Sequence, residues 1–144
     1  MKLTNFKISD DHIAIEDDTG RYFDLHNNFD LKEFRYDIKE RNFKLSWTKS
    51  LGNWVKEDEA NSIKLNFLNV TFLKIRELNQ EGIDEFKEDD LTLTMIGYSP
   101  IEGSDMESYL AISEDSEGKY AIIIQTQNGQ AILIYSEFVT AEIQ

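Results

Sequence analysis

Apolar side chains occupy every second position through much of this 144-residue chain, which is the pattern of β-strands with one buried face. The pattern is clearest in "FDLHNNFDLKEFRYDIKERNFKLSW", residues 23–47. Alternation runs from Phe34 to Ile38, is interrupted by the polar segment "KERN", and resumes from Phe43 to Trp47. This arrangement predicts an antiparallel hairpin that directs most of its aromatic side chains into a core.

Two further hairpins are predicted along the chain. Residues 13–15 and 23–25 alternate on either side of the turn sequence "EDDTG". In "YAIIIQTQNGQAILIYSEF", residues 120–138, Asn128 and Gly129 separate two β-rich runs. Both residues tolerate the positive φ angles of a type I′ turn, so we predict a hairpin with a tight two-residue connection.

The remaining pattern completes the fold class. Alternation at residues 63–67 and 91–95 predicts two strands, and the run at 72–78 predicts another that is covered on both faces. Short helices are predicted at "NQEGIDEFKEDD" (79–90) and "SDMESYLAI" (104–112). The sequence therefore predicts a single, mainly β domain, in which an antiparallel meander forms a barrel or a sandwich with one or two short helices.

Composition narrows the class of protein. The chain is 40% hydrophobic and has nine Phe, six Tyr and two Trp, which is enough apolar surface for a packed domain. It has no cysteine, so disulfides, thiolate metal sites and cysteine nucleophiles are excluded. No run has the length of a membrane span, and "MKLTNFKISDDH" lacks the apolar centre of a signal peptide. We therefore expect a cytoplasmic protein without a membrane partner.

Residues with catalytic or metal-binding chemistry are few. His12 and His26 have no spacing such as H-E-x-x-H, and we expect both to lie at strand ends. The acidic stretches "IEDDTG", "KEDDL" and "SEDSEG" lack the pattern of a calcium loop, and the first and last are expected to be hairpin turns. The sequence has no P-loop, G-x-S-x-G or dinucleotide fingerprint. We thus predict no catalytic residues, metal or cofactor, and no enzyme.

Charge is distributed unevenly. The formal net charge is -13, and residues 79–118 hold twelve acidic side chains against Lys87 alone. A surface of this charge repels nucleic acid and attracts a basic protein. Two interpretations are open: an ordinary solvated surface, or a docking face for a basic partner. The carboxylates that we assign to the docking face are Glu81, Asp84, Glu85, Glu88, Asp89, Asp90, Glu102, Asp105 and Glu107.

A long connection between predicted strands is the second unusual feature. "TKSLGNWVKEDEANS" follows Trp47, and connections of this length are uncommon in compact domains unless they are functional or disordered. Trp54 within it could be a partner-binding anchor, since Trp is enriched at interface hot spots. It could instead cover one end of a barrel, and of the two we favour the cover.

The segment from Phe29 to Ile75 carries a resemblance to a known type of protein. "FDLKEFRYDIKERNFKLSW", a loop, and then "IKLNFLNVTFLKI" resemble small bacterial β-rich proteins of the contact-toxin immunity type and related uncharacterised domains. The resemblance covers about a third of the chain and rests on hydrophobic phasing and the run from Leu65 to Val70. It implies a cytoplasmic, non-catalytic protein that blocks a basic toxin by direct contact.

The leading hypothesis from the sequence is thus a binding protein of immunity or inhibitor type that contacts a basic protein through an acidic face. The alternative is a lipocalin-like small-molecule carrier with a cavity lined by aromatics such as Phe34, Trp47, Phe67 and Phe72. A carboxylate enzyme is a third possibility. The oligomeric state is open, and an exposed edge strand would allow dimerisation by strand addition.

Overall fold

The computed structural model of the chain describes residues 1–76, 92–101, 120–127 and 129–144. Strands account for most of these residues. In chain order they are β1 (Lys2–Thr4), β2 (Phe6–Ile8), β3 (Ala14–Asp17), β4 (Tyr22–Asp24), β5 (Phe29–Asp37), β6 (Asn42–Lys49), β7 (Ser62–Arg76), β8 (Leu93–Pro100), β9 (Tyr120–Thr126) and β10 (Ala131–Ile143). The predicted mainly β class is confirmed, whereas both predicted helical segments lie outside the described residues.

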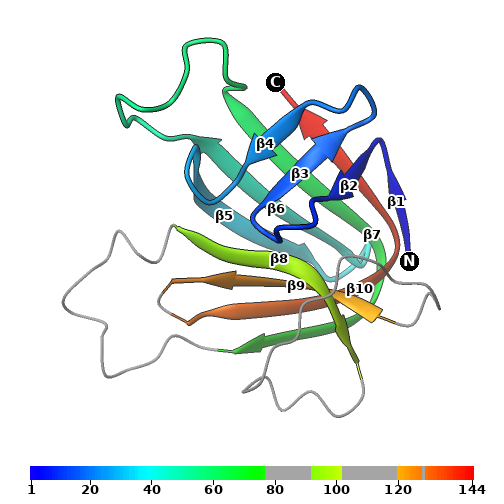
Figure 1. Cartoon of the computed structure of the whole chain (residues 1–144). Coiled ribbons are helices and arrows are strands. Elements are labelled where there is room, and N and C mark those ends of the chain that lie inside the picture. The colour runs from blue at the N-terminus through cyan, green and yellow to red at the C-terminus, as the bar shows by residue number, and fades with distance from the viewer. Residues whose placement is uncertain (77–91, 102–119, 128) are drawn as a thin grey trace.

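The strands form two sheets (Figure 1). The larger has the order β5-β6-β7-β10-β9-β8, and its neighbouring strands are antiparallel. Strand β1 adds to β10 in parallel, beside Phe138–Thr140. The smaller sheet is an antiparallel β2-β3-β4 meander.

Two long strands make the larger sheet curl. β7 pairs with β10 from Ile63 to Arg76, and the register shifts at Tyr135 and Ser136, which pair with Phe72 and Val70. Such a bulge bends a strand and increases its twist. The ladder therefore curves through both halves of the molecule and produces a half-barrel (Figure 1). The sequence pattern predicts two strands here, and this prediction is wrong because β7 continues through Asn69, which adopts a φ of 55°.

The smaller sheet closes the open side of the curl. The amide of Ile96 on β8 donates a 2.7 Å hydrogen bond to the carbonyl oxygen of His12, which lies between β2 and β3. The imidazole Nδ1 of His26, just after β4, lies against the carbonyl oxygen of Leu93. The three-stranded sheet is thus attached to the last strand of the large sheet.

One main core fills the space between the sheets. Its largest fully buried side chains include Trp47, Phe43 and Phe67 from the large sheet and Phe23 from the small one. A second cluster, formed by Ala121, Ile123, Ala131 and Leu133, lies on β9 and β10. Strand β9 alternates between the two clusters, with Ile122 and Ile124 in the main core. Both of its faces are therefore buried.

The predicted covering of residues 72–78 on both faces holds only at the start of the described part of that run, because Ile75 is 40% exposed. Phe72 packs against the second cluster and Leu73 against the main core, and both are partly buried. The full two-sided burial occurs instead on β9, whose run of isoleucines is the more apolar sequence. Sequences of this kind are typical of strands with both faces covered.

All three predicted hairpins are confirmed, as β3–β4, β5–β6 and β9–β10. The turn type predicted for the last one is wrong. The Thr126 amide donates to the Gln130 carbonyl oxygen at 2.9 Å, whereas a two-residue turn would pair Gln127 with Gln130. Gly129 has a φ of 80° and donates to the Thr126 carbonyl oxygen, and a glycine in this conformation is typical of three-residue loops.

The prediction that the alternating apolar side chains of β5 are buried in the core is correct only for the first residues of the strand. Phe29 and Leu31 are buried, but Phe34, Tyr36 and Ile38 are 40%, 38% and 80% exposed. Phe34 stacks on the buried Phe43 ring with centroids 5.8 Å apart, and its outer side faces solvent. The last part of β5 therefore extends beyond the elements that cover the sheet.

Candidate functional site

The structure places one predicted partner-binding residue, Trp54, in the connection between β6 and β7, residues 50–61. The other predicted contact residues lie outside the described residues. They are Glu81, Asp84, Glu85, Glu88, Asp89, Asp90, Glu102, Asp105 and Glu107. The candidate functional site is therefore this connection of residues 50–61, the Trp54 loop.

Main-chain hydrogen bonds fix both ends of the Trp54 loop. The amide of Ser50 donates to the carbonyl oxygen of Asn28 at 2.9 Å. At the other end, the amide of Asn61 donates to the carbonyl oxygen of Gln144, and Lys49 donates to Asn61 at 2.9 Å. The loop is thus attached to the connection between β4 and β5 and to the end of β10.

Polar contacts of Glu59 and of two basic side chains, Arg21 and Lys49, hold the second half of the loop in place. Glu59 has a side chain that is only 8% exposed, and its carboxylate accepts from the Asn28 side chain at 3.0 Å and lies 3.6 Å from the Arg21 guanidinium. The same guanidinium donates to the carbonyl oxygen of Asp58 at 2.6 Å. Lys49 Nζ donates to the carbonyl oxygen of Glu57 at 3.0 Å. These bonds give a long connection a defined backbone path.

Trp54 is exposed although it is held in place. Its indole N–H donates a 2.9 Å hydrogen bond to the carbonyl oxygen of Asn27, while 66% of the residue remains accessible. A β-carbon added at Gly52 would lie 2.3 Å from the indole ring, so the ring rests directly on this glycine. Leu51 beside it is fully exposed. The interpretation of Trp54 as a cover over the core is therefore wrong, because a covering residue would be buried.

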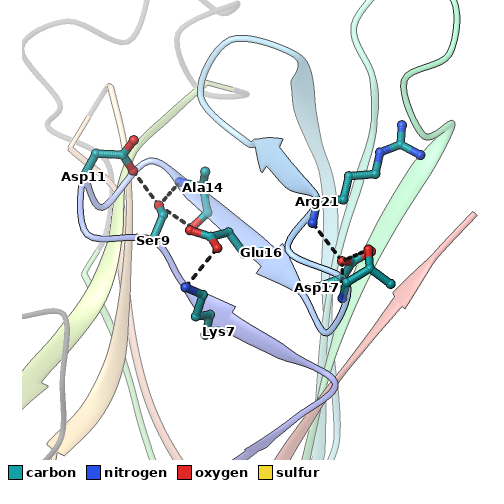
Figure 2. Close-up of polar contacts among 8 residues, drawn as sticks. Lys7, Ser9, Asp11, Ala14, Glu16, Asp17 and Arg21 are labelled. Atoms are coloured by element: carbon teal, nitrogen blue, oxygen red, sulfur yellow. Dashed lines mark hydrogen bonds and ion pairs between the residues drawn. The ribbon is translucent and has the colours of Figure 1, made fainter.

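The small sheet holds a compact polar group that the sequence did not single out (Figure 2). The Ser9 hydroxyl lies 2.5 Å from Asp11 Oδ1 and 2.9 Å from the Ala14 carbonyl oxygen, and the Tyr22 hydroxyl donates to Asp11 Oδ2 at 2.5 Å. Burial raises the pKa of Asp11, but hydrogen bonds from Ser9, Tyr22 and the Ile13 amide outweigh it and lower that pKa. Burial and the bond to Asp11 raise the pKa of Tyr22 far above its ordinary value.

The acidic turn "EDDTG" serves the backbone, as predicted. Asp17 Oδ1 accepts from the Thr19 amide and hydroxyl at 2.9 and 2.6 Å and from the Arg21 amide at 3.0 Å (Figure 2). Chiefly the Thr19 hydroxyl lowers the pKa of this carboxyl. Gly20 completes the turn with a φ of 81°. The second predicted turn, in "SEDSEG", lies outside the described residues.

Both histidines lie at strand ends, as the sequence predicted. His12 uses its main chain to connect the sheets, and its Nδ1 is buried without a hydrogen-bond partner in the described part of the chain. His26 contacts the Leu93 carbonyl oxygen. No cluster of three or more histidine and carboxylate groups suited to a metal ion occurs within residues 1–76, 92–101, 120–127 and 129–144.

A polar groove of about 680 Å³ crosses the outer face of β5, β6, β7 and β10. Arg35 lies directly opposite Lys44 across the β5–β6 ladder. Lys64 Nζ is 4.0 Å from Glu142 Oε2, and Asn66 Nδ2 donates to Glu142 Oε1 at 2.9 Å. Glu33 and Asp37 also line the groove, so it contains as many acidic as basic side chains. Sequence analysis missed the groove because the register between strands creates it.

The four aromatics proposed to line a carrier cavity are not brought together. Trp47 and Phe67 are fully buried in the main core, and Phe34 is 40% exposed. Phe72 packs against the second cluster. The packed positions of these side chains give the carrier alternative no structural support.

Comparisons with known proteins provide no relative. No family model, curated protein or solved structure matches this chain. Within the described segments, no helix is long and apolar enough to cross a membrane.

Proposed function

We propose that the chain is a non-catalytic binding protein of immunity or inhibitor type, which acts in the cytoplasm and contacts a basic protein. The observation that carries the proposal is that Trp54 is 66% exposed and yet tethered to Asn27 and seated on Gly52. A large apolar side chain held in this way loses little conformational entropy on binding. Such residues are typical anchors of protein interfaces.

The charge of the chain supports a basic partner. Residues 79–118 carry twelve acids and one base, and they include the nine carboxylates of the predicted docking face. An indole ring also attracts the cationic groups of Lys and Arg, so Trp54 suits the same kind of partner. The acidic segment would accelerate association and the tryptophan would slow dissociation.

A low-salt pull-down with the chain as bait tests the proposal. We expect basic proteins to be retained at about 50 mM salt and released at about 500 mM, because screening shortens the range of surface charges. Trp54→Ala should release the same proteins. Reversing the charges of Glu85, Asp89 and Glu107 together should do so as well. Phe138→Ala, which removes an aromatic that is 37% exposed on β10, is the matched control and should retain them.

Gly52→Ala separates an anchor from a merely exposed tryptophan. The new methyl group overlaps the indole ring and displaces it from Gly52, although the tryptophan itself is retained. We expect retention of the basic protein to fall at least about threefold, because the ring must be ordered again on binding. If Trp54→Ala and the triple charge reversal both leave retention unchanged, or no basic protein is retained, the proposed function is wrong.

A further inference from the structure

Strand β5 is one of the two end strands in the described order of the larger sheet, and β8 is the other. One edge of β5 pairs with β6, and no described strand pairs with its second edge. Every residue from Lys32 to Asp37 is exposed. An edge of this length presents unpaired amide and carbonyl groups to which another strand can add.

The inner face of this edge is apolar. Phe34 and Tyr36 lie with ring centroids 5.8 and 6.3 Å from that of Phe43, and each is more than a third exposed. Ile38, directly after the strand, is 80% exposed. These three side chains form an apolar strip along the edge, and its exposure is a cost that a partner strand would remove.

The outer face of the same edge is charged, with both signs in alternation. Glu33, Arg35 and Asp37 follow one another on this face, and Lys39 lies in the turn beyond. Asp37 Oδ1 accepts from the amides of Lys39 and Glu40, which leaves Oδ2 available. Within the described residues, Arg35 has no carboxylate within ion-pair distance. The edge is thus locally neutral in a chain of net charge -13, and it does not repel a copy of itself.

One antiparallel register between two β5 strands brings opposite charges together on the outer face and apolar side chains together on the inner face. When a two-fold axis passes through Tyr36, Arg35 lies opposite Asp37 of the second copy within the two strands, and Phe34 faces Ile38 of the second copy, the turn residue that directly follows β5. Each pair occurs twice by symmetry, and the flexible side chain of Lys39 can reach Glu33 of the second copy. Opposite charges and apolar pairs directly across an antiparallel ladder stabilise it.

Neighbouring registers are unfavourable. Centring the axis on Arg35 places that residue opposite itself and Glu33 opposite Asp37. Centring it on Asp37 places Asp37 opposite itself and Arg35 opposite Lys39. An axis through Phe34 would bring the bulge between Leu31 and Glu33 into the ladder. Like charges directly opposite one another destabilise a sheet, so the register through Tyr36 is selected.

We propose that two copies of the chain associate through β5, in antiparallel register about Tyr36, into one continuous sheet. A two-fold interface uses the same patch on both subunits, and β5 supplies a self-complementary patch. Because the edge is far shorter than a standard interface, we expect a reversible dimer.

The absence of cysteine permits a direct test of the register. In Tyr36→Cys the new thiol lies next to its symmetry mate, so mild oxidation should give a disulfide-linked dimer. Phe34→Cys should cross-link poorly, because its opposite residue is Ile38, whereas Phe34→Cys with Ile38→Cys should cross-link well. Leu51→Cys, at a fully exposed position, controls for random collision. Equal cross-linking of Tyr36→Cys and Leu51→Cys overturns the proposal.

Charge reversal tests the ion pairs without oxidation. Sedimentation of the unmodified chain should give a mass that rises with concentration from 16.8 kDa toward twice that value. Arg35→Asp alone and Asp37→Arg alone should each dimerise at least about tenfold more weakly, because two like-charge pairs replace two attractive ones. An equimolar mixture should dimerise again, since every pair is then complementary. Lys2→Asp, an exposed position on β1, which pairs with β10 and not with β5, should leave the dimer intact. An unmodified chain that remains monomeric at about 1 mM would refute the dimer.

Discussion

The side chain of Asn5 pairs with the main chain of Ala141 as though it were a residue of a neighbouring strand. Its Nδ2 donates to the Ala141 carbonyl oxygen at 2.7 Å, and its Oδ1 accepts from the Ala141 amide at 3.0 Å. Asn5 itself adopts a φ of 63° between β1, which adds to the large sheet, and β2, which belongs to the small one. One amide therefore continues the ladder of β10 while the main chain leaves for the other sheet.

Asn5→Ala is expected to lower the free energy of unfolding by about 1–3 kcal/mol, because it removes both bonds and leaves in the left-handed region a residue that tolerates this conformation less well than Asn. Urea denaturation measures this loss. Asn5→Gly separates the two causes, since glycine loses the bonds but tolerates the backbone angle. If both variants match the parent in stability, the amide has no structural role.

The two tryptophans should differ sharply in their contribution to stability. Trp47 is fully buried in the main core, so Trp47→Ala is expected to cost about 3–5 kcal/mol. Trp54→Ala removes one hydrogen bond at an exposed site and should cost no more than about 1 kcal/mol. Urea denaturation compares the variants. Iodide quenching of fluorescence should affect Trp54 alone, and comparable quenching of Trp47 in Trp54→Phe would contradict the burial described here.

Asp11 should contribute to stability only above acidic pH. Folding lowers its pKa, so its contribution is present above the unfolded pKa, about 3.9, and is lost as the pH falls through the folded pKa. We expect the urea midpoint of the parent chain to fall more between about pH 4 and 2 than that of Asp11→Asn. If the urea midpoints of the two proteins fall equally as the pH is lowered, the bonds from Ser9 and Tyr22 add no stability.

The contribution of Tyr22 to stability should depend on pH in the opposite way, falling at alkaline pH. Folding raises the pKa of its hydroxyl, so the contribution is present below the unfolded pKa, about 10, and is lost as the pH rises above it. The parent chain should therefore lose more stability between about pH 9 and 11 than Tyr22→Phe, which has no ionisable group there. The measurement is the urea midpoint at each pH. Parallel curves for the two proteins would contradict the hydrogen bond to Asp11.

The fold should become more stable when the repulsion between the two basic residues Arg35 and Lys44 in the outer groove is removed. Arg35 lies opposite Lys44, and Lys44→Glu would turn this repulsion into attraction, worth about 0.2–1 kcal/mol. Lys44→Gln removes the repulsion alone and should give a smaller gain. Urea denaturation at low and high salt checks the origin, because the gain should shrink when charges are screened. A gain that is independent of salt would exclude the electrostatic explanation.

Sequence reasoning predicted the candidate site only in part. It identified Trp54 from its place in a long connection, but it favoured a buried cover, whereas the side chain is 66% exposed. Nothing in the order of residues indicates that Gly52 supports the ring or that Asn27 accepts from it. These partners depend on how the loop folds back on the connection between β4 and β5, which is a tertiary contact.

The sequence by itself determined the local pairing and the buried face of most strands. Alternation places Phe43, Leu45 and Trp47 on one side of β6, and all three residues are buried in the structure. Only the tertiary structure decided how far the other elements extend over the sheet. Phe34, Tyr36 and Ile38 alternate in the same way as buried residues and are nevertheless exposed. Periodicity fixes the direction of a side chain, whereas the length and curvature of neighbouring strands determine whether anything covers it. The register that joins Arg35 to Lys44 and the bend in β7 and β10 arise from the same non-local pairing.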